Sequence, residues 1–417
     1  STQGVSSAAS DVYKRQVLNW AEECQKFTPE LSCVVVDGDA AHRAELAESW
    51  PAADLVVTSY DLLRRDEALY EGQEFYACIL DEAQAIKNHT TQKYKAVCKV
   101  RSRVRFALTG TPVENRLGEL WSIFSFLMPG YLPPYKSFCS RFEKPIVQEE
   151  DRTAVRRLNQ LTGPFILRRM KSDVLKELPP KTENVYRIEL EEEQRKLYLA
   201  AVVDAREKLQ AAKPEDKMAV FAVLMRLREI CCDPRLIADN WEGGSAKLDA
   251  CAELVSSAVE GGHRILLFSQ FTSMLELLAK RLDAEGISHF TLQGSTPKPV
   301  RAELVRRFNG GEVSVFLISL RAGGTGLNLT AADIVIHYDP WWNVAAQNQA
   351  TDRAYRIGQQ NPVQVYKLIA QDTIEEKIVE LQQAKQSLAD TVTGTADGAI
   401  LSMRPDELLQ LLEGSEP

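Results

Sequence analysis

The order of apolar and polar positions divides the chain into two β–α alternations separated by a helical region. In the first alternation, helix-compatible stretches separate short β-rich runs that end in polar residues, at 33–38, 54–60, 77–82 and 103–111. Continuous apolar strands of this kind are typical of a parallel sheet with helices on both faces. The pattern therefore predicts an α/β fold.

A second alternation begins near Lys247 and predicts strands at 263–271, 288–294, 313–329, 333–340 and 363–370. Between about 114 and 246 the apolar spacing is helical, and the basic stretch 165–190, interrupted by prolines, indicates a linker between lobes. The predicted organisation has five parts: a foreign or mis-joined segment (1–16), a first lobe with the start of a helical protrusion (17–170), a linker and protrusion (171–245), a second lobe (246–392), and a flexible tail with a short helix (393–417).

Composition narrows the class of protein. Of the 417 residues, 45% are hydrophobic and 26% charged, as in soluble globular proteins, and no apolar run approaches the roughly 20 residues of a membrane span. The eight cysteines form no C-x-x-C pair, which argues against a zinc site or a disulfide framework and favours a reducing cytoplasm. A net charge of −8 gives no global attraction to nucleic acid, although a local basic groove stays compatible with it.

The first candidate site is the adjacent pair Asp81 and Glu82, which directly follows an apolar run. In parallel sheets ligands bind at the carboxyl ends of strands, where Thr58–Tyr60 and Thr109–Thr111 are also expected. Nucleotide hydrolysis needs one carboxylate for Mg²⁺ and another to orient the attacking water, and adjacent side chains that point apart can divide these tasks. A solvated strand end is the simpler interpretation, but three converging polar strand ends favour a site.

The second candidate lies near the C-terminus. Gln349, Arg353 and Arg356 follow at i, i+4 and i+7, which predicts that they share one helix face. An exposed basic face is the simpler interpretation. However, neither arginine has an acidic residue four positions later, and arginines presented across a cleft can stabilise charge on a transferring phosphoryl group.

Two further stretches suggest nucleic-acid contacts. Three glycines follow an apolar strand after Arg321, where that arginine, Thr325 and Asn328 could hold a phosphate backbone. The stretch is not a P-loop, because the chain contains no G-x-x-x-x-G-K-[ST] sequence. Trp341 and Trp342 end another predicted strand; aromatic packing is the commoner role for such a pair, and base stacking is the alternative.

Seven motifs in family order resemble the SWI/SNF-type branch of superfamily-two helicase-like ATPases, with bacterial members most similar. They are LDEAQAIKN, LTGTPVENRLGELWSIFSFLMPGYL, FILRRMKSDVLKELPPK, LREICCDP, LLFSQF, LISLRAGGTGLNLTAADIVIHYDPWWN and QATDRAYRIGQ. The likeness extends from about Val17 to the C-terminus. It implies two RecA-like lobes of P-loop NTPase architecture with helical insertions, and an ATP-driven translocase on double-stranded DNA.

The resemblance also implies residue roles. Asp81 would hold Mg²⁺, Glu82 would activate water, and Gln84 with the turn at Gly110 and Thr111 would link the state of bound ATP to motion. Arg353 and Arg356 match arginine fingers, with Gln349 beside them. Residues that match motifs contacting DNA, or coupling DNA to ATP, are Thr58, Tyr60, Ser269, Gln270, Arg321, Gly323, Gly324 and Thr325; Trp342 is added as a candidate DNA contact.

One departure from the family affects the expected activity. The phosphate-binding loop should precede VLNWAEEC, but here only STQGVSSAASDVYKRQ does, so the first lobe is expected to be incomplete. Without that loop a triphosphate loses its backbone cradle and lysine contact. We therefore expect the chain as printed to bind ATP poorly and to hydrolyse it slowly or not at all, and the complete gene product to be active.

The expected partners are double-stranded DNA and DNA-bound proteins such as RNA polymerase, with no membrane. The expected state is a monomer in the cytoplasm, associated with the nucleoid. Two alternatives stay open: a non-catalytic DNA-binding module and a strand-separating helicase. Intact carboxylates and arginines argue against the first, and the helical insertion argues against the second.

Overall fold

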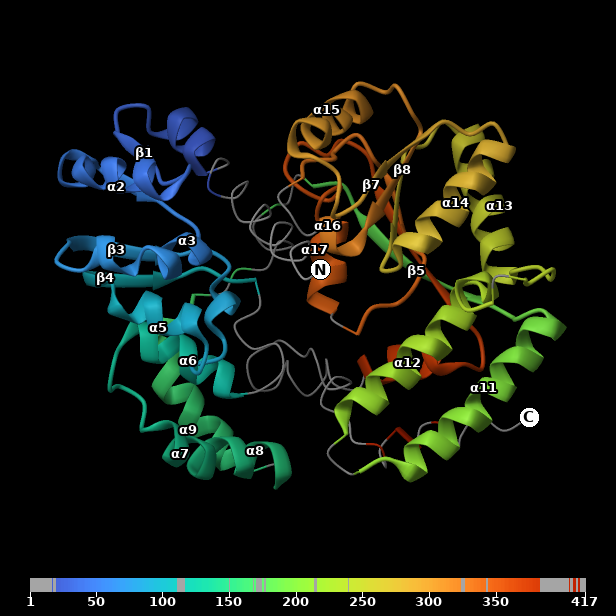
Figure 1. The fold of residues 1–417 in the computed structure, drawn as a ribbon, viewed down its shortest axis with the longest axis horizontal. Helices are drawn as coiled ribbons and strands as arrows, with labels where there is room; N and C mark the ends of the chain where they lie inside the picture. The colour runs from blue at the N-terminus through green and yellow to red at the C-terminus, as the bar shows by residue number, and fades with distance from the viewer. Residues whose placement is uncertain are drawn as a thin grey trace. The chain divides into compact units, whose positions relative to one another are not determined.

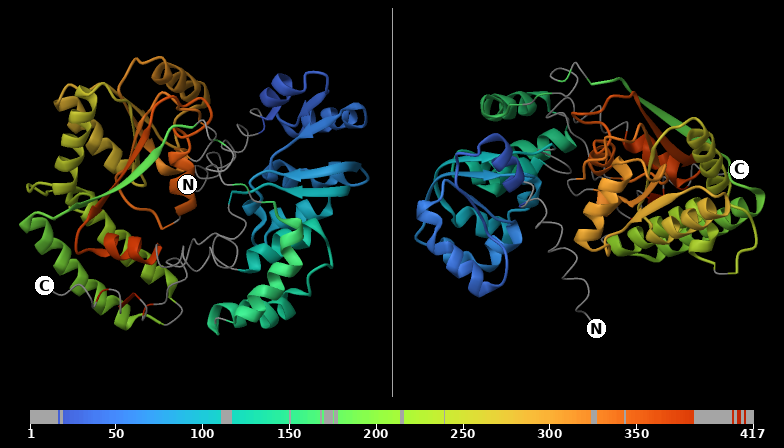
Figure 2. Two further views of the ribbon diagram at one scale, coloured as in Figure 1. Left: turned by 180° about the vertical axis from the view of Figure 1, so that it is seen from behind. Right: turned by 90° about the horizontal axis from the view of Figure 1, so that it is seen from above.

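The structure is a computed structural model. It describes Val17, residues 20–110, 117–149, 151–167, Arg169, Leu175, 178–213, 216–238, 240–323, 327–342, 344–382, Pro405, Leu408, Leu409 and Leu412. The chain forms two compact units, and the division falls between Arg168 and Arg169. Figures 1 and 2 show the ribbon, coloured from blue at the N-terminus to red at the C-terminus.

The first unit contains two separate pairs of parallel strands in its described part. Strand β1 (Cys33–Val35) pairs with β2 (Leu55–Val57), and β3 (Glu74–Leu80) pairs with β4 (Arg101–Ala107). The predicted strands are present, but the described residues do not join them into one sheet. The helices of this unit are α2 (Ala40–Glu48), α3 (Tyr60–Arg65), α4 (Glu67–Tyr70), α5 (Gln92–Lys99), α6 (Leu117–Leu127), α7 (Tyr135–Phe138), α8 (Lys144–Gln148) and α9 (Arg152–Thr162).

Local sequence signals account for the helix starts in this unit. The side chains of Asp39, Ser59, Thr91 and Asp151 each accept a hydrogen bond from a backbone N–H in the first turn of α2, α3, α5 and α9. Such caps satisfy amides that have no partner within the helix. Apolar residues of β3, α5 and α6 then meet in one core. The opposite face of the β3–β4 pair is apolar and exposed, at Ile79, Val104, Phe106 and Leu108.

The second unit is built on a six-stranded parallel sheet in the order β5-β10-β9-β6-β8-β7. The strands are β5 (Lys181–Ile188), β6 (Ile265–Ser269), β7 (His289–Leu292), β8 (Val315–Ser319), β9 (Ile334–His337) and β10 (Val363–Ala370). The prediction of an α/β fold with a parallel second-lobe sheet is confirmed. Alternate side chains face opposite sides of a strand, so one set packs on α13 (Ala246–Glu260) and α14 (Thr272–Ala284). The other set packs on α15 (Lys298–Asn309) and α17 (Val344–Thr351) (Figure 1).

Strand β5 corrects the prediction of a linker at 165–190 for residues 181–188, while the division between the two units does fall inside the predicted stretch. All eight of its residues pair in register with β10, from Lys181 opposite Val363 to Ile188 opposite Ala370. Only Ile188 is buried, because β5 is an edge strand whose side chains face solvent. The stretch therefore lacks the apolar pattern of a strand, and pairing with β10 determines its conformation.

Helices α11 (Glu192–Ala211) and α12 (Lys217–Cys232) pack against each other beside this sheet. Leu408 and Leu412 from the end of the chain are fully buried against them, and Leu409 packs there partly buried. Apart from Pro405, the other residues of the predicted tail lie outside the described residues, as does the predicted segment 1–16. No described helix combines the length and apolar character needed to cross a bilayer.

Candidate functional site

The carboxyl end of β3 brings together the residues predicted for the first lobe. Asp81 follows the strand, and its Oδ2 accepts a hydrogen bond from Trp20 Nε1 at 2.9 Å while its Oδ1 accepts one from the Glu82 amide at 3.0 Å. Tyr60 at the start of α3 donates its hydroxyl to the Asp81 carbonyl at 2.8 Å. The convergence of strand ends expected from the sequence is thus present for 60 and 81.

Glu82 has a left-handed backbone, with φ 49° and ψ 52°. Among the described residues, only Asp372 shares a positive φ without being glycine. This conformation costs a non-glycine residue on the order of 1–3 kcal/mol and is concentrated at functional sites. It is maintained here by the next residue, because the Ala83 amide donates to the carbonyl of Leu108 beyond β4 at 2.9 Å.

A chain of side-chain hydrogen bonds links β3 to β4 at the same edge. Thr109 Oγ1 donates to Gln84 Oε1 at 2.7 Å, and Gln84 Nε2 donates to Glu82 Oε2 at 2.5 Å. A change at the Thr109 turn can therefore reach the Glu82 carboxylate through one amide side chain. This contact agrees with the coupling role expected for Gln84, which itself stays a prediction.

The two carboxylates fit a magnesium site. Mg²⁺ is usually held by one or two carboxylates together with water and phosphate oxygens, so a cage of three protein ligands is not required. Within the described part of the chain no group of three or more His, Cys, Asp or Glu side chains could hold a metal. Asp81 is half-buried, and its carboxylate accepts one bond at each oxygen, which leaves lone pairs for a cation.

Thr58 differs from the prediction of a DNA contact. Its Oγ1 is fully buried near the hydroxyl of Tyr70, a residue whose pKa burial raises to about 12. The Thr58 hydroxyl consequently lies in the interior of the unit and is not presented at its surface. Gly110 ends the described part of the β4 turn, and Thr111 lies outside it.

In the second unit, Ser269 and Gln270 also make internal contacts. Ser269 is 1% exposed, and its Oγ donates to Asp339 Oδ1 at 2.6 Å. The side-chain oxygen of Gln270 accepts from Arg228 Nη1 at 2.7 Å. The prediction that the Ser269 side chain contacts DNA directly is therefore wrong for this structure, because its hydroxyl is buried and hydrogen-bonded to Asp339.

The alternative of base stacking by Trp342 is also wrong, and aromatic packing is confirmed. Trp342 is 3% exposed, its ring stacks on Trp341 with centroids 4.4 Å apart, and Phe221 of α12 packs against its edge. Removing so large an apolar ring from water favours the interior position.

Helix α17 ends before the two arginines. Gln349 lies in α17, but the helix stops at Thr351, and Arg353 and Arg356 follow in turns. The amides of Arg353 and Ala354 bond three residues back, which rotates the chain by about 120° a residue instead of 100°. The prediction that Gln349, Arg353 and Arg356 share one helix face is therefore wrong. Arg356 is exposed, and Arg353 is half-buried.

Two residues that the sequence analysis did not identify support the turn with the arginines. The buried ring of His337 contacts Thr351 Oγ1 through Nε2 at 2.9 Å, at the end of α17. Gln359 Nε2 donates to the carbonyls of Ala332 and Ala354. Burial lowers the pKa of His337 to about 3, so this ring is neutral. The position of Gln359 directly after the RAYRIG motif was a usable signal, whereas His337 lies in β9 and gave none.

Part of the predicted second-lobe site cannot be placed. Gly324 and Thr325 lie outside the described residues. The backbone of Arg321 and Gly323 belongs to the short helix α16 (Leu320–Gly323), which begins where β8 ends, but the arginine side chain is not described.

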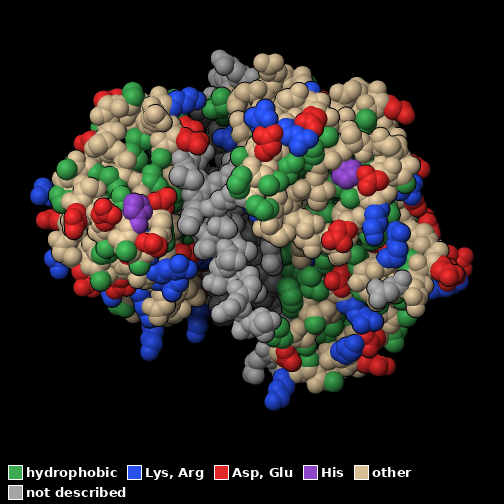
Figure 3. All heavy atoms as spheres, turned by 45° about the horizontal axis from the view of Figure 1, so that its top comes forward, with side chains coloured by type: hydrophobic (Ala, Val, Ile, Leu, Met, Phe, Trp, Pro, Cys, Tyr) green, Lys and Arg blue, Asp and Glu red, His purple; other side chains and the backbone are tan. Residues whose placement is uncertain are grey.

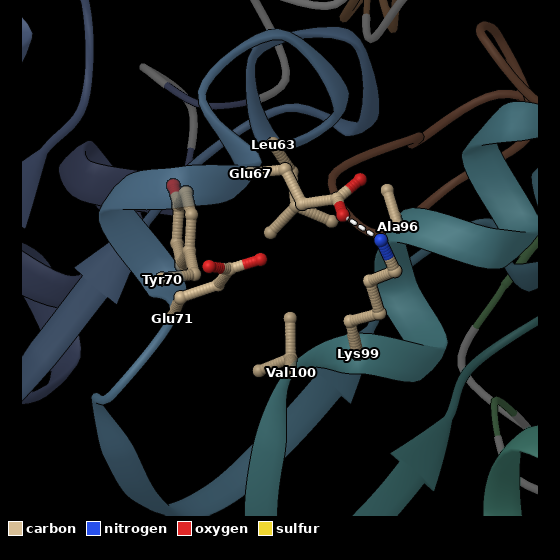
Figure 4. A pocket seen from close by; sticks show the side chains of 7 residues that line it. All are labelled: Leu63, Glu67, Tyr70, Glu71, Ala96, Lys99 and Val100. Atoms are coloured by element: carbon tan, nitrogen blue, oxygen red, sulfur yellow. Dashed lines mark hydrogen bonds and ion pairs between the residues drawn. The ribbon is translucent and has the colours of Figure 1, made fainter.

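Two spaces in the described part of the structure differ greatly in size, and the larger one, of about 500 Å³, is open and lies in the second unit beside Arg264, Asp333 and Gln359. The void between α3, α4 and α5 has a volume of about 10 Å³ and is lined by Leu63, Tyr70 and Val100, with an ion pair between Glu67 and Lys99 at its rim (Figure 4). A space of that size holds at most one water molecule, so it is a packing gap. On the face displayed in Figure 3, Lys and Arg side chains alternate with Asp and Glu and form no continuous basic field.

Comparison with known proteins gives the family. Residues 12–236 match the SNF2-related domain, and residues 246–358 match the helicase conserved C-terminal domain. The chain belongs to the SNF2 family. Its carboxylate pair and its arginine turn thus lie in the SNF2-related and helicase C-terminal domains, respectively.

Two similar proteins agree with the assignment by their sequences. An uncharacterized ATP-dependent helicase of Mycoplasma pneumoniae is 39% identical over 402 residues, which cover 95% of this chain and 38% of that protein. The mouse SWI/SNF-related matrix-associated actin-dependent regulator of chromatin subfamily A member 1 is 35% identical, over 96% of this chain and 40% of that protein. The Sulfolobus solfataricus SWI2/SNF2 ATPase core solved with double-stranded DNA is 34% identical, over 91% of this chain and 81% of that one, with a TM-score of 0.46. The chain spans about two-fifths of the length of the first two relatives.

Proposed function

We propose that this chain forms the motor core of an ATP-dependent translocase that moves along double-stranded DNA and remodels protein–DNA complexes. Family membership supports ATP as the nucleotide, and the relative from Mycoplasma is named an ATP-dependent helicase. DNA-bound proteins such as RNA polymerase are the proposed targets. The proposed setting is the cytoplasm, with the protein acting on the nucleoid as a monomer.

The observation that carries the proposal is the strained strand end at Glu82. The hydrogen bond between Ala83 and Leu108 holds Glu82 at φ 49°, and Gln84 fixes its carboxylate. This conformation lowers stability, and a strand end that is merely solvated would have no reason to keep it. In the proposed site Glu82 orients the attacking water. Asp81 is the residue that would hold Mg²⁺, which when bound neutralises charge on the phosphates.

Two parts of the second unit complete the proposal. Exposed Arg356 and half-buried Arg353 are proposed to stabilise charge on the transferring phosphoryl group, with Gln349 nearby on α17. Arg321, Gly323, Gly324 and Thr325, which follow β8, are proposed to contact DNA or couple it to hydrolysis.

The test measures ATP hydrolysis with and without DNA, on the chain as printed and on the product of its whole open reading frame. Duplex DNA is expected to stimulate hydrolysis by the whole product, and Glu82→Gln is expected to lower the rate at least 100-fold because the water loses its orienting carboxylate. The matched control is Glu74→Gln, an exposed glutamate at the start of the same strand, which is expected to change the rate less than twofold.

The outcomes separate the alternatives. Stimulation by single strands alone, with unwinding of a forked duplex, would support a strand-separating helicase instead. DNA binding without any hydrolysis by the whole product would support a non-catalytic binding module. Full activity of Glu82→Gln would refute the role given to the strand end.

A further inference from the structure

Arg228 of α12 is a fully buried charge that connects three segments distant in the sequence. Its Nη1 donates to Gln270 Oε1 at 2.7 Å, and its Nη2 donates to Asp339 Oδ2 at 3.0 Å and to the carbonyl of Pro340 at 2.6 Å. The Arg228 and Asp339 side chains are both 0% exposed. The guanidinium therefore ties α12 to the residues that follow β6 and β9.

The acceptors are themselves fixed. Asp339 Oδ1 accepts from Ser269 Oγ at 2.6 Å and from the Gln270 amide at 3.1 Å. A single carboxylate thus joins the ends of two neighbouring strands of the sheet. At the end of α12, the Cys232 carbonyl accepts from the Tyr338 hydroxyl at 2.9 Å and gives a second link between this helix and the end of β9.

Aromatic rings enclose the guanidinium. Its Cζ lies 4.8 Å from the centroid of Trp342, 5.5 Å from that of Phe271 and 5.6 Å from that of Trp341. Cations over indole and phenyl faces are stabilised by the ring quadrupole, and Arg presents a planar fork that Lys cannot reproduce. The arrangement is specific to arginine in both its hydrogen bonds and its ring contacts.

Stability alone is a poor explanation for such a group. Replacing a buried ion pair with apolar side chains is often neutral or stabilising, so the pair is more informative as a device that fixes one arrangement. Arg228 Nε adds a cost, because it is buried with no hydrogen-bond partner among the described residues. Arg228 fixes an arrangement of three segments: the SQF stretch (Ser269–Phe271) at the end of β6, the DPWW stretch (Asp339–Trp342) after β9, and the helical pair α11–α12.

We propose that Arg228 and Asp339 are positioning residues that couple DNA to ATP hydrolysis, by locking Gln270 and the Trp341–Trp342 pair onto α12. The inference rests on the proposed function. The SQF stretch acts through this internal network, and displacement of either strand end is transmitted to α12 as a rigid movement. Neither residue touches nucleotide or DNA in this mechanism.

The experiment compares the ratio of DNA-stimulated to basal ATP hydrolysis in the product of the whole open reading frame. Arg228→Lys keeps the charge and loses the fork, and is expected to lower the ratio at least fivefold. Arg226→Gln removes an exposed arginine two positions earlier on the same helix and is expected to leave the ratio unchanged. Gln270→Met removes the acceptor of Arg228 Nη1 without burying a new charge, and is expected to lower the ratio in the same direction.

Hydrogen exchange of peptides from β6 and β9 shows whether each variant is folded. If Arg228→Lys alters exchange in these strands, Gln270→Met decides the question. A wild-type ratio above one with unchanged ratios in both variants would overturn the inference and leave the proposed function intact. An equal fall of basal and stimulated rates in a folded variant would also overturn it, since that pattern indicates structural damage. A wild-type ratio of one would refute the proposed function itself.

Discussion

The buried ion pair between Lys247 and Glu375 gives a quantitative prediction for the second unit. Lys247 Nζ lies 2.5 Å from Glu375 Oε2, and both side chains are 0% exposed. The same carboxylate oxygen accepts from the Ala370 amide at the end of β10 at 2.9 Å. Burial lowers the pKa of Lys247, but the attraction of Glu375 outweighs this effect and raises it overall, so the lysine is charged at neutral pH.

Removing one charge leaves the other buried without a counter-ion, which costs about 3–5 kcal/mol. Glu375→Gln keeps an acceptor for the Ala370 amide and is expected to cost about 4 kcal/mol of unfolding free energy, and Lys247→Met about 3 kcal/mol. The double variant contains neither charge. We expect it to lie within about 1 kcal/mol of the wild type, so the two substitutions should be strongly non-additive.

The assay is urea unfolding, with hydrogen exchange of β6, β9 and β10 peptides to report on the second unit by itself. Glu192→Gln is the control, because Glu192 forms an exposed ion pair with Lys196 and should cost less than about 0.5 kcal/mol. Raising the pH from 7 to 9.5 should reduce the deficit of Glu375→Gln. In this variant Lys247 is buried without its counter-ion, so its pKa is depressed and, as the pH rises, it loses its proton in the folded state before it does so in the unfolded chain. Additive effects of the two single substitutions would refute the reasoning.

Two other predictions concern His337 and Glu82. Burial lowers the pKa of His337 to about 3, so as the pH falls below about 6.5 the histidine takes up a proton in the unfolded chain before it does so in the folded one. The free energy of unfolding should therefore fall between pH 6.5 and 3, and this residue alone should lower it by about 2 kcal/mol at pH 5 relative to pH 7. Urea unfolding of His337→Gln should show a decrease in unfolding free energy between pH 7 and 5 that is smaller than that of the wild type by this amount. An identical decrease in the variant and the wild type would show that another group is responsible. Glu82→Gly should be more stable than Glu82→Ala by about 1 kcal/mol, because glycine adopts a positive φ without strain. Equal melting curves for these two variants would contradict the strain at Glu82.

The sequence by itself determined the fold class, five of the six strands of the second sheet and the family. Runs such as Ile265–Ser269 and Val315–Ser319 are buried on both faces, and this burial requires a continuous apolar sequence that can be recognised without any partner. The carboxylates after β3 were located because they directly follow an apolar run, although one face of that strand is exposed. The rule that parallel strands end at one edge also predicted that the strand ends near Tyr60 and Asp81 converge, and the two residues are in contact although the described residues do not join β2 and β3 into one sheet.

Only the tertiary structure decided the features that depend on a partner distant in the sequence. Strand β5 is polar because it lies at an edge, and it is a strand because β10 pairs with it. The end of α17 at Thr351 and the positive φ of Glu82 are set by His337 and by Leu108, which lie 14 and 26 positions away. The burial of Trp342 depends on α12, and the role of Arg228 appears only when the ends of β6 and β9 meet that helix. Local propensity carries no information on such contacts, because their energy belongs to pairs of segments that the fold alone brings together.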